Sequence, residues 1–355
     1  MRIAMISPLY ESVPPKLYGG TERVVHYLTE ELVKAGHDVT LFASADSQTS
    51  ARLAGGCGPA LRLDETCRDP LAHHFMMFEK VLEMQGEFDV IHSNVDYIGM
   101  AFAKRTTMPF VTTVHGRLDL EDTVRVYTAY NGFPLVSISN SQRLPLPEAN
   151  WAATIYHGLP ENLYSLREKP GDYLAFIGRI SPEKCVDSAI RIAVLAGIPL
   201  KIAAKVDKAD QKYFEAIIKP LLAHPLVEFV GEVNDREKDE LTGNALAFLH
   251  PVDWPEPFGL AMIEAMACGT PVLGRKRGSI PEVIDNGITG FIFERDEDAV
   301  KILRDAIPGL DRRRCRAHFE KRFSAARMAA DYHRVYERVA GETAGVYRRK
   351  MHARS

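Results

Sequence analysis

The chain of 355 residues has few cysteines, and their arrangement suits neither a metal site nor a disulfide framework. The five cysteines are odd in number, scattered and without a C-x-x-C pair: Cys57, Cys67, Cys185, Cys268 and Cys315. A zinc site needs clustered thiolates, and a disulfide scaffold needs an even number of cysteines at close spacing. We therefore expect a reducing compartment and no structural zinc.

The sequence also lacks long apolar runs and an excess of positive charge. No segment approaches the roughly 18 apolar residues that a membrane span needs. The first residues, 1–8, contain one basic residue and a short apolar run, which is typical of a first β-strand and not of a signal peptide. A net charge of -3 does not indicate the basic surface that nucleic-acid-binding proteins use. We expect a cytoplasmic protein with no nucleic-acid partner.

What the chain does contain is two series of short apolar segments that alternate with helical patterns. The first series comprises residues 2–7, 38–44, 89–93, 109–115, 135–139 and 153–157, and the second comprises 173–178, 200–205, 227–231, 247–251, 271–274 and 290–293. Strands this apolar are expected to be buried on both faces, which predicts parallel sheets covered by helices. The charged segment 161–172 contains Pro170 and Gly171, and it is interpreted as a linker between two domains.

The most informative stretch begins at Glu256. Pro255 and Pro257 flank this residue and hold it in a loop, whereas residues 258–267 are good helix formers and end at Gly269. Glu256 would thus lie just before a helix N-terminus, and Glu264 about two turns further along. If the span were all helical, the two carboxylates would be about 12 Å apart at 1.5 Å per residue.

That separation is too large for a carboxylate pair acting on one bond. It suits a long ligand whose two ends offer hydroxyl groups, with an anion received between them by the amides of the helix start. A nucleotide sugar has this layout of sugar hydroxyls, pyrophosphate and ribose hydroxyls. The competing interpretation is an ordinary core helix with one solvated glutamate. It is disfavoured because Glu264 lies within an apolar run, where an unpaired charge is costly.

Two cations follow the first strand of the second series. Arg179 and Lys184 flank a Ser-Pro-Glu helix start, five residues apart. Cations at the carboxyl end of such a strand suit a pyrophosphate, with arginine binding as a fork and lysine as a point charge. We expect both side chains to lie on a loop and to bond only to phosphate. A solvated loop is the alternative.

A glycine pair follows the first strand of the chain. Gly19 and Gly20 end a long loop and precede a helix predicted over residues 23–34. Glycines at a helix N-terminus let a ligand approach the backbone, although such a pair can also be a plain turn.

Together these motifs carry a family resemblance. The E-x7-E pattern with P-F-G inside it, followed by A-C-G-T-P-V, resembles the signature of the family-4 retaining glycosyltransferases with the GT-B fold. The likeness extends over essentially the whole chain and includes G-R-x-x-x-x-K at Arg179 and Lys184. Four positions depart from the family pattern: Cys185, Lys205 and Ser279 stand where glycine is usual, and His157 replaces an asparagine.

The resemblance implies roles for the second half of the chain. Arg179 and Lys184 would bind the donor's phosphates. Glu256 and the backbone amides of Phe258, Gly259 and Leu260 would hold the sugar. Glu264 would hold the ribose, and the backbone around Val233 would pass the nucleobase.

In the first half, the resemblance implies that His115 lies beside the transferred sugar. Taken alone, a histidine at the end of a strand is more often structural. The same resemblance places the loop with Gly19 and Gly20 near donor and acceptor.

The implied architecture is α/β, with two Rossmann-like domains that face a central cleft. The expected domains are an acceptor-side domain over residues 1–165, a nucleotide-sugar domain over 166–325, and a helix with a basic tail over 326–355 that crosses back to the first domain. The tail, residues 347–354, either touches anionic lipid weakly or has no fixed structure.

The implied activity is retaining transfer of a hexose from a nucleotide diphosphate sugar to an acceptor hydroxyl. The donor is expected to be UDP-glucose, or next GDP-mannose, and the acceptor a carbohydrate, a lipid-linked or a small molecule. No cofactor or metal is expected, because GT-B enzymes generally need none and residues 296–298 are interpreted as a helix start. An epimerase or hydrolase of the same fold, and a non-catalytic nucleotide-sugar-binding protein, are the alternatives. The sequence leaves the oligomeric state open.

Overall fold

The computed structural model describes the backbone of residues 1–16 and 18–352 and the side chains of residues 1–16 and 18–342. The chain divides into two units. The first unit contains Met1–Gly158 together with the chain from Ala325 onwards, and the second contains Leu159–Ser324. The basic tail discussed above lies outside the described side chains.

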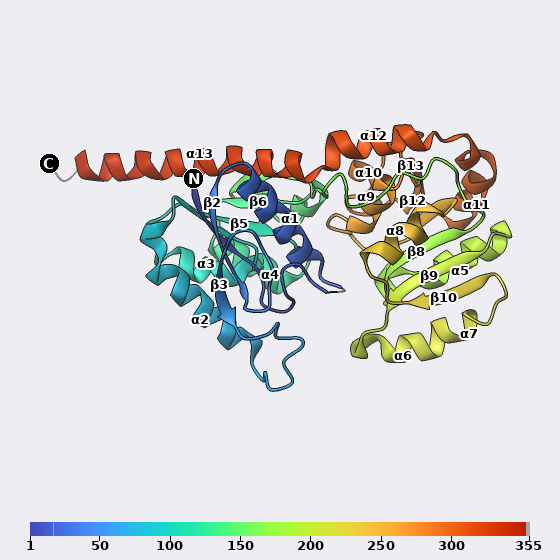
Figure 1. Ribbon diagram of the computed structural model, residues 1–355, viewed down its shortest axis with the longest axis horizontal. Coiled ribbons are helices and arrows are strands. Elements are labelled where there is room, and N and C mark those ends of the chain that lie inside the picture. Colours follow the sequence, from blue (N-terminus) through green and yellow to red (C-terminus); the bar gives the residue numbers. More distant parts are fainter. Residues whose placement is uncertain (17, 353–355) are drawn as a thin grey trace. The chain divides into compact units, whose positions relative to one another are not determined.

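The first unit is built on a sheet of seven strands in the order β3-β2-β1-β4-β5-β6-β7 (Figure 1). Every neighbouring pair is parallel. The strands are β1 (Arg2–Ile6), β2 (Asp38–Ser44), β3 (Arg52–Cys57), β4 (Val90–Ser93), β5 (Phe110–Val114), β6 (Leu135–Ser137) and β7 (Trp151–Thr154). Strand β3 was not predicted, because its Gly55-Gly56 pair and its short apolar content give a weak strand pattern.

Helices cover both faces of this sheet (Figure 1). They are α1 (Gly20–Lys34), α2 (Pro70–Glu83), α3 (Met100–Ala103), α4 (Glu121–Ala129) and α13 (Ala325–His352), with the short 3₁₀ turns η1 (Gln85–Glu87), η2 (Asp96–Gly99) and η3 (Ser141–Arg143). Helices α1 and α13 pack against each other, and α2 packs against α3 and β3. The C-terminal helix therefore belongs to the first unit, as predicted.

A buried polar chain fixes α13 to the sheet. His92 on β4 contacts the Tyr336 hydroxyl through Nδ1 and the Thr113 hydroxyl through Nε2, both at 2.7 Å. Thr113 in turn contacts the Tyr332 hydroxyl at 2.9 Å. Burial lowers the pKa of His92 to about 3, so the ring is neutral at physiological pH.

The second unit repeats the plan with a sheet of six strands in the order β10-β9-β8-β11-β12-β13, again all parallel. The strands are β8 (Leu174–Arg179), β9 (Leu200–Lys205), β10 (Val227–Gly231), β11 (Ala247–His250), β12 (Val272–Arg275) and β13 (Gly290–Phe293). Its core joins the sheet to α5 and α11 through buried aliphatic side chains.

Helices and short helical turns connect and follow these strands. They are η4 (Pro182–Lys184), α5 (Val186–Ala196), η5 (Lys208–Asp210), α6 (Gln211–Tyr213), η6 (Phe214–Ile218), α7 (Lys219–Leu221), α8 (Asp235–Gly243), α9 (Leu260–Ala267), α10 (Ile280–Val283), α11 (Asp296–Asp305), η7 (Ile307–Gly309) and α12 (Arg312–Phe323).

The segment 161–172 is not a free linker, so that interpretation was wrong. Tyr164 is only 3% exposed. The amide of Ser165 donates to Asp239 Oδ1 at 2.8 Å, and the amide of Arg167 donates to the Cys268 carbonyl at 3.0 Å. The segment is therefore held to the second unit by buried apolar and backbone contacts, while its charged residues Glu161, Glu168, Lys169 and Asp172 are exposed.

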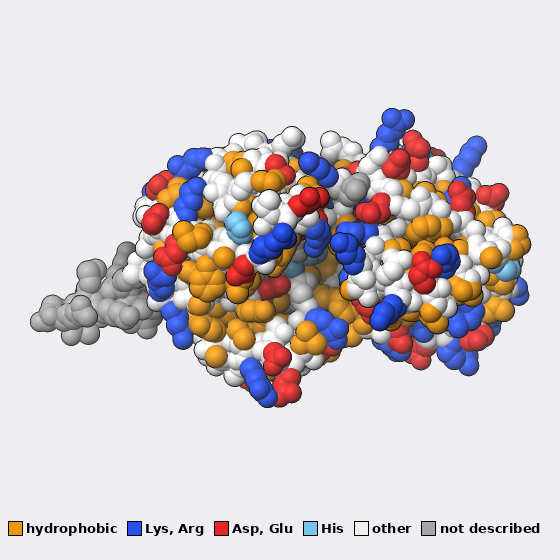
Figure 2. Space-filling view, turned by 90° about the horizontal axis from the view of Figure 1, so that it is seen from below, with side chains coloured by type: hydrophobic (Ala, Val, Ile, Leu, Met, Phe, Trp, Pro, Cys, Tyr) orange, Lys and Arg blue, Asp and Glu red, His pale blue; other side chains and the backbone are white. Residues whose placement is uncertain are grey.

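On the face that Figure 2 shows, Lys and Arg side chains are interspersed with Asp and Glu side chains. Within the described part of the chain, no helix is both long enough and apolar enough to cross a membrane.

Candidate functional site

The charged residues that the sequence singled out in the second unit lie at the carboxyl ends of its strands. Arg179 is the last residue of β8, Lys184 ends the turn η4 that follows, and Glu256 lies in the loop after β11. Open parallel sheets bind ligands at this edge, because the loops there connect strands to helix N-termini.

Glu256 and Lys184 form a buried ion pair. Lys184 Nζ lies 2.5 Å from Glu256 Oε2, and the two side chains are only 15% and 8% exposed. Trp254 Nε1 donates to the same carboxylate oxygen at 3.0 Å, and the Lys184 ammonium lies 4.9 Å from the centre of the Trp254 ring. Burial opposes the charge on Glu256, yet Lys184 and His250 hold its pKa below the usual value. The Glu256 carboxyl is therefore ionised.

His250, at the end of β11, completes the surroundings of this pair. Its Nε2 lies 3.8 Å from Glu256 Oε2. Burial lowers the pKa of His250 to about 4, so the ring is neutral. Sequence analysis did not identify His250 or Trp254, although both stand within six residues of Glu256.

The backbone around Glu256 requires two glycines. Gly259 has φ 83°, and a Cβ there would lie 2.7 Å from the Met262 side chain. Gly278 has φ 50°, and its Cβ would lie 2.4 Å from the backbone nitrogen of Glu256. Both positions combine left-handed backbone with no room for a side chain, so any other residue would displace the loop that carries Glu256.

Helix α9 begins two residues later than predicted. The prediction began it at Phe258, but Gly259 is its N-cap and Leu260 its first residue. Phe258 is 2% exposed, and its carbonyl accepts a hydrogen bond from Ser279 Oγ at 3.0 Å. Among the described residues no side chain caps α9. The amides at its start are thus positioned to receive an anion or a hydroxyl oxygen.

Arg179 also has acidic partners. Its guanidinium lies 3.1 Å from Glu183 Oε1 and 3.6 Å from Asp207 Oδ2. Lys205, its register partner on β9, lies 3.2 Å from the same Asp207. The expectation that Arg179 and Lys184 lie on a loop and bond only to phosphate was therefore wrong, because Arg179 ends a strand and both cations are neutralised by carboxylates of their own unit.

Glu264 lies inside α9, 4% exposed. Lys238 Nζ on α8 is 2.9 Å from its Oε1, and the Tyr164 hydroxyl donates to the same atom at 3.3 Å. The carboxylate is buried but not unpaired. Lys238 was not identified from the sequence, since a lysine on a charged helix gives no sign of the residue it will meet 26 positions away.

Val233 follows β10 and is half-buried. Gly231, just before it, has φ 87°, which turns the backbone at the end of the strand. The next residue, Asn234, caps α8 by accepting from the amide of Glu237 at 3.1 Å.

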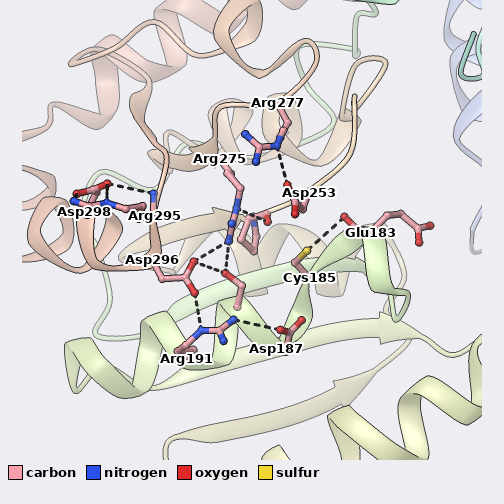
Figure 3. Close-up of polar contacts among 12 residues, drawn as sticks. Glu183, Cys185, Asp187, Arg191, Asp253, Arg275, Arg277, Arg295, Asp296 and Asp298 are labelled. Carbon is pink, nitrogen blue, oxygen red and sulfur yellow. Dashed lines mark hydrogen bonds and ion pairs between the residues drawn. The ribbon is translucent and has the colours of Figure 1, made fainter. Parts of the chain in front are cut away.

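A second polar network joins the end of β12 to two helices of the second unit (Figure 3). Arg275 donates to Asp296 at 2.8 Å and to the Ser188 hydroxyl at 2.7 Å. Asp296 also accepts from Arg191 at 2.7 Å. The network ties the end of β12 to α5 and α11. Asp296 therefore pairs with two arginines, as well as standing at a helix start.

Cys185 adopts a left-handed conformation with φ 51°, at the position where the family resemblance expected glycine. Glycine takes this conformation without strain, whereas a cysteine there costs energy. The residue lies directly after Lys184 and begins the turn into α5.

In the first unit, His115 follows β5. Its Nε2 lies 3.0 Å from Asn94 Oδ1, and its ring stacks on His157 with centroids 5.3 Å apart. Burial lowers the pKa of His115 to about 3. Its Nδ1 has no hydrogen-bond partner among the described residues. His115 is thus a neutral imidazole with one nitrogen still able to bond.

Gly19 and Gly20 form the start of α1, which begins three residues before the predicted position. Gly19 is the N-cap, and a Cβ there would lie 2.7 Å from the Pro15 side chain. Close approach of the loop thus requires this glycine. Glu22, in the first turn of the same helix, was not identified from the sequence; it is 6% exposed.

The structure therefore distributes the sequence-derived site residues over both units. Those with acidic or basic side chains lie in the second unit together with Val233, Phe258, Gly259 and Leu260, whereas His115, Gly19 and Gly20 lie in the first. Over residues 1–16 and 18–342, no group of three or more His, Cys, Asp or Glu side chains is arranged to hold a metal ion.

Comparison with known proteins covers both units. Residues 18–162 match the model described as Glycosyltransferase Family 4, and residues 165–319 match the model described as Glycosyl transferases group 1. Glycogen synthase of Mycobacterium tuberculosis is 27% identical over 98% of this chain and 94% of its own length. Phosphatidyl-myo-inositol mannosyltransferase of Mycolicibacterium smegmatis is 25% identical over 96% of this chain and 95% of its own.

Among solved structures, Anabaena Alr3699/HepE in complex with UDP-glucose superposes with a TM-score of 0.73 at 19% identity, over 96% of this chain and all of the other. This likeness supports the fold, with two Rossmann-like units on parallel sheets of seven and six strands. Taken with the two family models, it shows that the chain belongs to the family-4 glycosyltransferases of the GT-B fold.

Proposed function

We propose that this glycosyltransferase moves a hexose from a nucleotide diphosphate sugar to an acceptor hydroxyl with retention of anomeric configuration. The observation that supports this most is the buried Lys184–Glu256 pair beside the uncapped start of α9. It offers a cation for a phosphate, a carboxylate for a sugar hydroxyl and amides for an oxygen, all at one edge of the sheet.

In the proposed reaction, the bond between the anomeric carbon and the diphosphate oxygen breaks, and the acceptor oxygen bonds to the same carbon on the same face. The acceptor's proton passes to the departing diphosphate, so no protein nucleophile is required. Lys184 and Arg179 stabilise the negative charge that develops on the leaving group. Both cations would exchange a carboxylate partner for phosphate when the donor binds.

Glu256 would hold the sugar, because a carboxylate with a lowered pKa stays ionised and accepts hydrogen bonds from hydroxyl groups. Glu264, inside α9, would hold the ribose, and the backbone at Val233 would lie beside the nucleobase. His115 would lie beside the transferred sugar. Its neutral ring can accept or donate one bond through Nδ1.

The donor to test first is UDP-glucose, and the next is GDP-mannose. The structure of Alr3699/HepE contains UDP-glucose, and the relative from Mycolicibacterium smegmatis is named as a mannosyltransferase. We propose that the reaction needs no metal ion or cofactor and that the acceptor is a carbohydrate, a lipid-linked or a small molecule. We also propose that the protein works in the cytoplasm.

The experiment that tests the donor assignment uses Glu264→Gln and Glu256→Gln. UDP contains ribose and no hexose. Glu264→Gln should weaken calorimetric binding of UDP by about 1–3 kcal/mol, because it removes a charge-assisted bond from a buried carboxylate. Glu256→Gln should leave UDP binding nearly unchanged yet lower the rate of transfer from UDP-glucose, because it misplaces the sugar. Equal weakening of UDP binding by both variants would contradict the assignment.

Products separate transfer from the alternative activities. Transfer gives a glycoside whose anomeric configuration matches the donor, as proton NMR of the product reports. Free glucose would indicate a hydrolase, and a changed nucleotide sugar would indicate an epimerase.

A further inference from the structure

Two exposed tyrosines follow neighbouring strands of the first unit. Ile6, at the end of β1, is the register partner of Ser93, at the end of β4. Tyr10 lies four residues beyond Ile6, and Tyr97 lies four residues beyond Ser93. The two side chains are 39% and 45% exposed. Adjacent parallel strands thus deliver two aromatic rings to the same edge of the sheet.

Packing holds each ring in place. The Tyr97 ring meets the buried Tyr127 ring edge to face at 6.3 Å. The Tyr10 ring lies 5.1 Å from the His74 ring. Burial, followed by the neighbouring Tyr97 hydroxyl, raises the pKa of Tyr10, which agrees with the two phenols lying close together.

Acidic groups and one arginine adjoin the tyrosines. Arg62 donates its amide to the Tyr10 carbonyl at 3.1 Å, and its guanidinium lies 2.7 Å from Glu11 Oε1. Glu11 is 8% exposed, and its Cγ would lie 3.3 Å from a Cβ on Gly19. Glu22, three residues after Gly19, is 6% exposed. Burial and the charge of Glu11 raise the pKa of Glu22 to about 7.

This arrangement, which we name the tyrosine shelf, consists of Tyr10, Tyr97, Glu11, Glu22 and Arg62. It adjoins His115, because Asp96, the residue before Tyr97, accepts the amide of His115 at 3.0 Å.

The chemistry of the shelf selects among acceptors. Aromatic rings that expose an apolar face and a hydroxyl suit ligands with apolar C–H faces and many hydroxyls. Carboxylates accept hydrogen bonds from hydroxyl groups. The single cation is already neutralised by Glu11, and Glu22 adds a further acid. A phosphate or carboxylate on the acceptor would meet like charge here, which costs binding energy.

We propose that the tyrosine shelf is the acceptor subsite and that the acceptor is a neutral carbohydrate. This rests on the proposed transferase function. It narrows the acceptor class to sugars without phosphate or carboxylate and leaves phosphorylated lipid headgroups outside it.

The test measures acceptors separately from the donor. Neutral di- and trisaccharides (maltose, cellobiose, sucrose and maltotriose) and glucose 6-phosphate are offered with UDP-glucose and with GDP-mannose, and the acceptor KM is measured for each. Tyr10→Ala and Tyr97→Ala should each raise the KM for the neutral acceptor by about tenfold, as expected for the loss of a stacked ring. The donor KM and the Kd for UDP should not change. Phe229→Ala is the matched control, because Phe229 on β10 is an aromatic side chain of similar exposure, at 37%.

A binding arm keeps the test decisive if no transfer is observed. The same saccharides are titrated into the protein with UDP present, and both tyrosine variants should weaken the neutral saccharide's Kd by about tenfold. If the protein binds UDP but no saccharide, the proposal that the tyrosine shelf is the acceptor subsite is overturned, and the donor assignment is unaffected. Saccharide binding that depends on the tyrosines, without transfer from either donor, would support the shelf and count against the proposed function.

Charge gives a second, independent readout. At pH 8, above the Glu22 pKa of about 7, Glu22→Gln should increase the use of glucose 6-phosphate relative to the neutral acceptor, because it removes one like charge. Wild-type preference for glucose 6-phosphate, or unchanged acceptor KM in both tyrosine variants, would overturn the proposal.

Discussion

The two units differ in the charge state of their buried polar side chains. In the second, buried charged side chains are held by opposite charges, as in the pairs Lys184–Glu256 and Lys238–Glu264. In the first, the buried histidines His115 and His92 are neutral rings because burial lowers the pKa of each. This contrast agrees with the proposed binding of a charged donor by the second unit and of a neutral acceptor by the first.

The difference has an energetic consequence. A buried ion pair adds little net stability, because desolvation of both charges offsets their attraction, but removing one partner leaves an uncompensated charge. The same step in the first unit removes a neutral hydrogen bond, which costs less.

Lys184→Met should give the largest change. Activity should fall by about 10²–10³-fold, as for loss of one preorganised group that stabilises transition-state charge. Unlike a substitution on a free loop, it should also lower the free energy of unfolding by about 3–5 kcal/mol, because Glu256 stays buried without its partner. Urea unfolding and kcat/KM measure the two effects.

The double variant Lys184→Met with Glu256→Gln should regain most of that stability and none of the activity. Arg179→Ala is the matched control, because this side chain is 30% exposed and its partners are similarly exposed. It should cost at most about 1 kcal/mol of stability and still reduce kcat/KM. If the single Lys184 variant unfolds at the same urea concentration as the wild type, the pair is not buried as described.

Glu22→Gln should change the pH dependence of stability. Burial raises the pKa of this carboxyl in the folded chain to about 7, above its ordinary value of 4.5. The folded chain therefore binds this proton more tightly, and stability from this group is lost as pH rises from 4.5 through 7. The variant has no such loss, so its advantage over the wild type should grow between pH 5 and pH 8, by up to about 3 kcal/mol at 1.36 kcal/mol per pKa unit.

Thermal unfolding at pH 5 and pH 8 measures this difference. Glu31→Gln on the same helix serves as the control, and it should show no comparable trend. A stability difference between the Glu22 variant and the wild type that is independent of pH would contradict the description of a desolvated carboxyl.

Tyr336→Phe should cost about 1 kcal/mol of stability, because it removes a neutral hydrogen bond to His92 at 2.7 Å and leaves the ring packing unchanged. The kcat/KM for transfer should not change. Urea unfolding of Tyr336→Phe beside Tyr332→Phe gives the measurement. A loss of about 3–5 kcal/mol would contradict this prediction, because removing the neutral bond would then cost as much stability as removing one partner of the charged pair in the second unit.

Addition of EDTA should have the smallest effect, with no change in transfer rate, since we propose that Arg179 and Lys184 neutralise the leaving diphosphate. Loss of activity that manganese or magnesium restores would show that a metal supplies this charge instead.

Much of the fold could be predicted from the sequence because the signals are local. Short apolar segments separated by helical patterns predicted two parallel sheets, and the prolines Pro255 and Pro257 together with Gly269 predicted the loop and helix around Glu256. Strand β3 was missed because Gly55-Gly56 weakens the local pattern, and pairing with β2 decides its structure.

Backbone preferences and motif spacing act over a few residues, so the sequence was sufficient to predict which groups stand at the strand ends. Their partners depend on contacts between segments far apart in the chain. Lys184 meets Glu256 across 72 positions, and His92 meets Tyr336 across 244. Burial, and with it the charge state of each group, follows from those contacts, because desolvation and the nearest opposite charge depend on distances that only the folded chain defines.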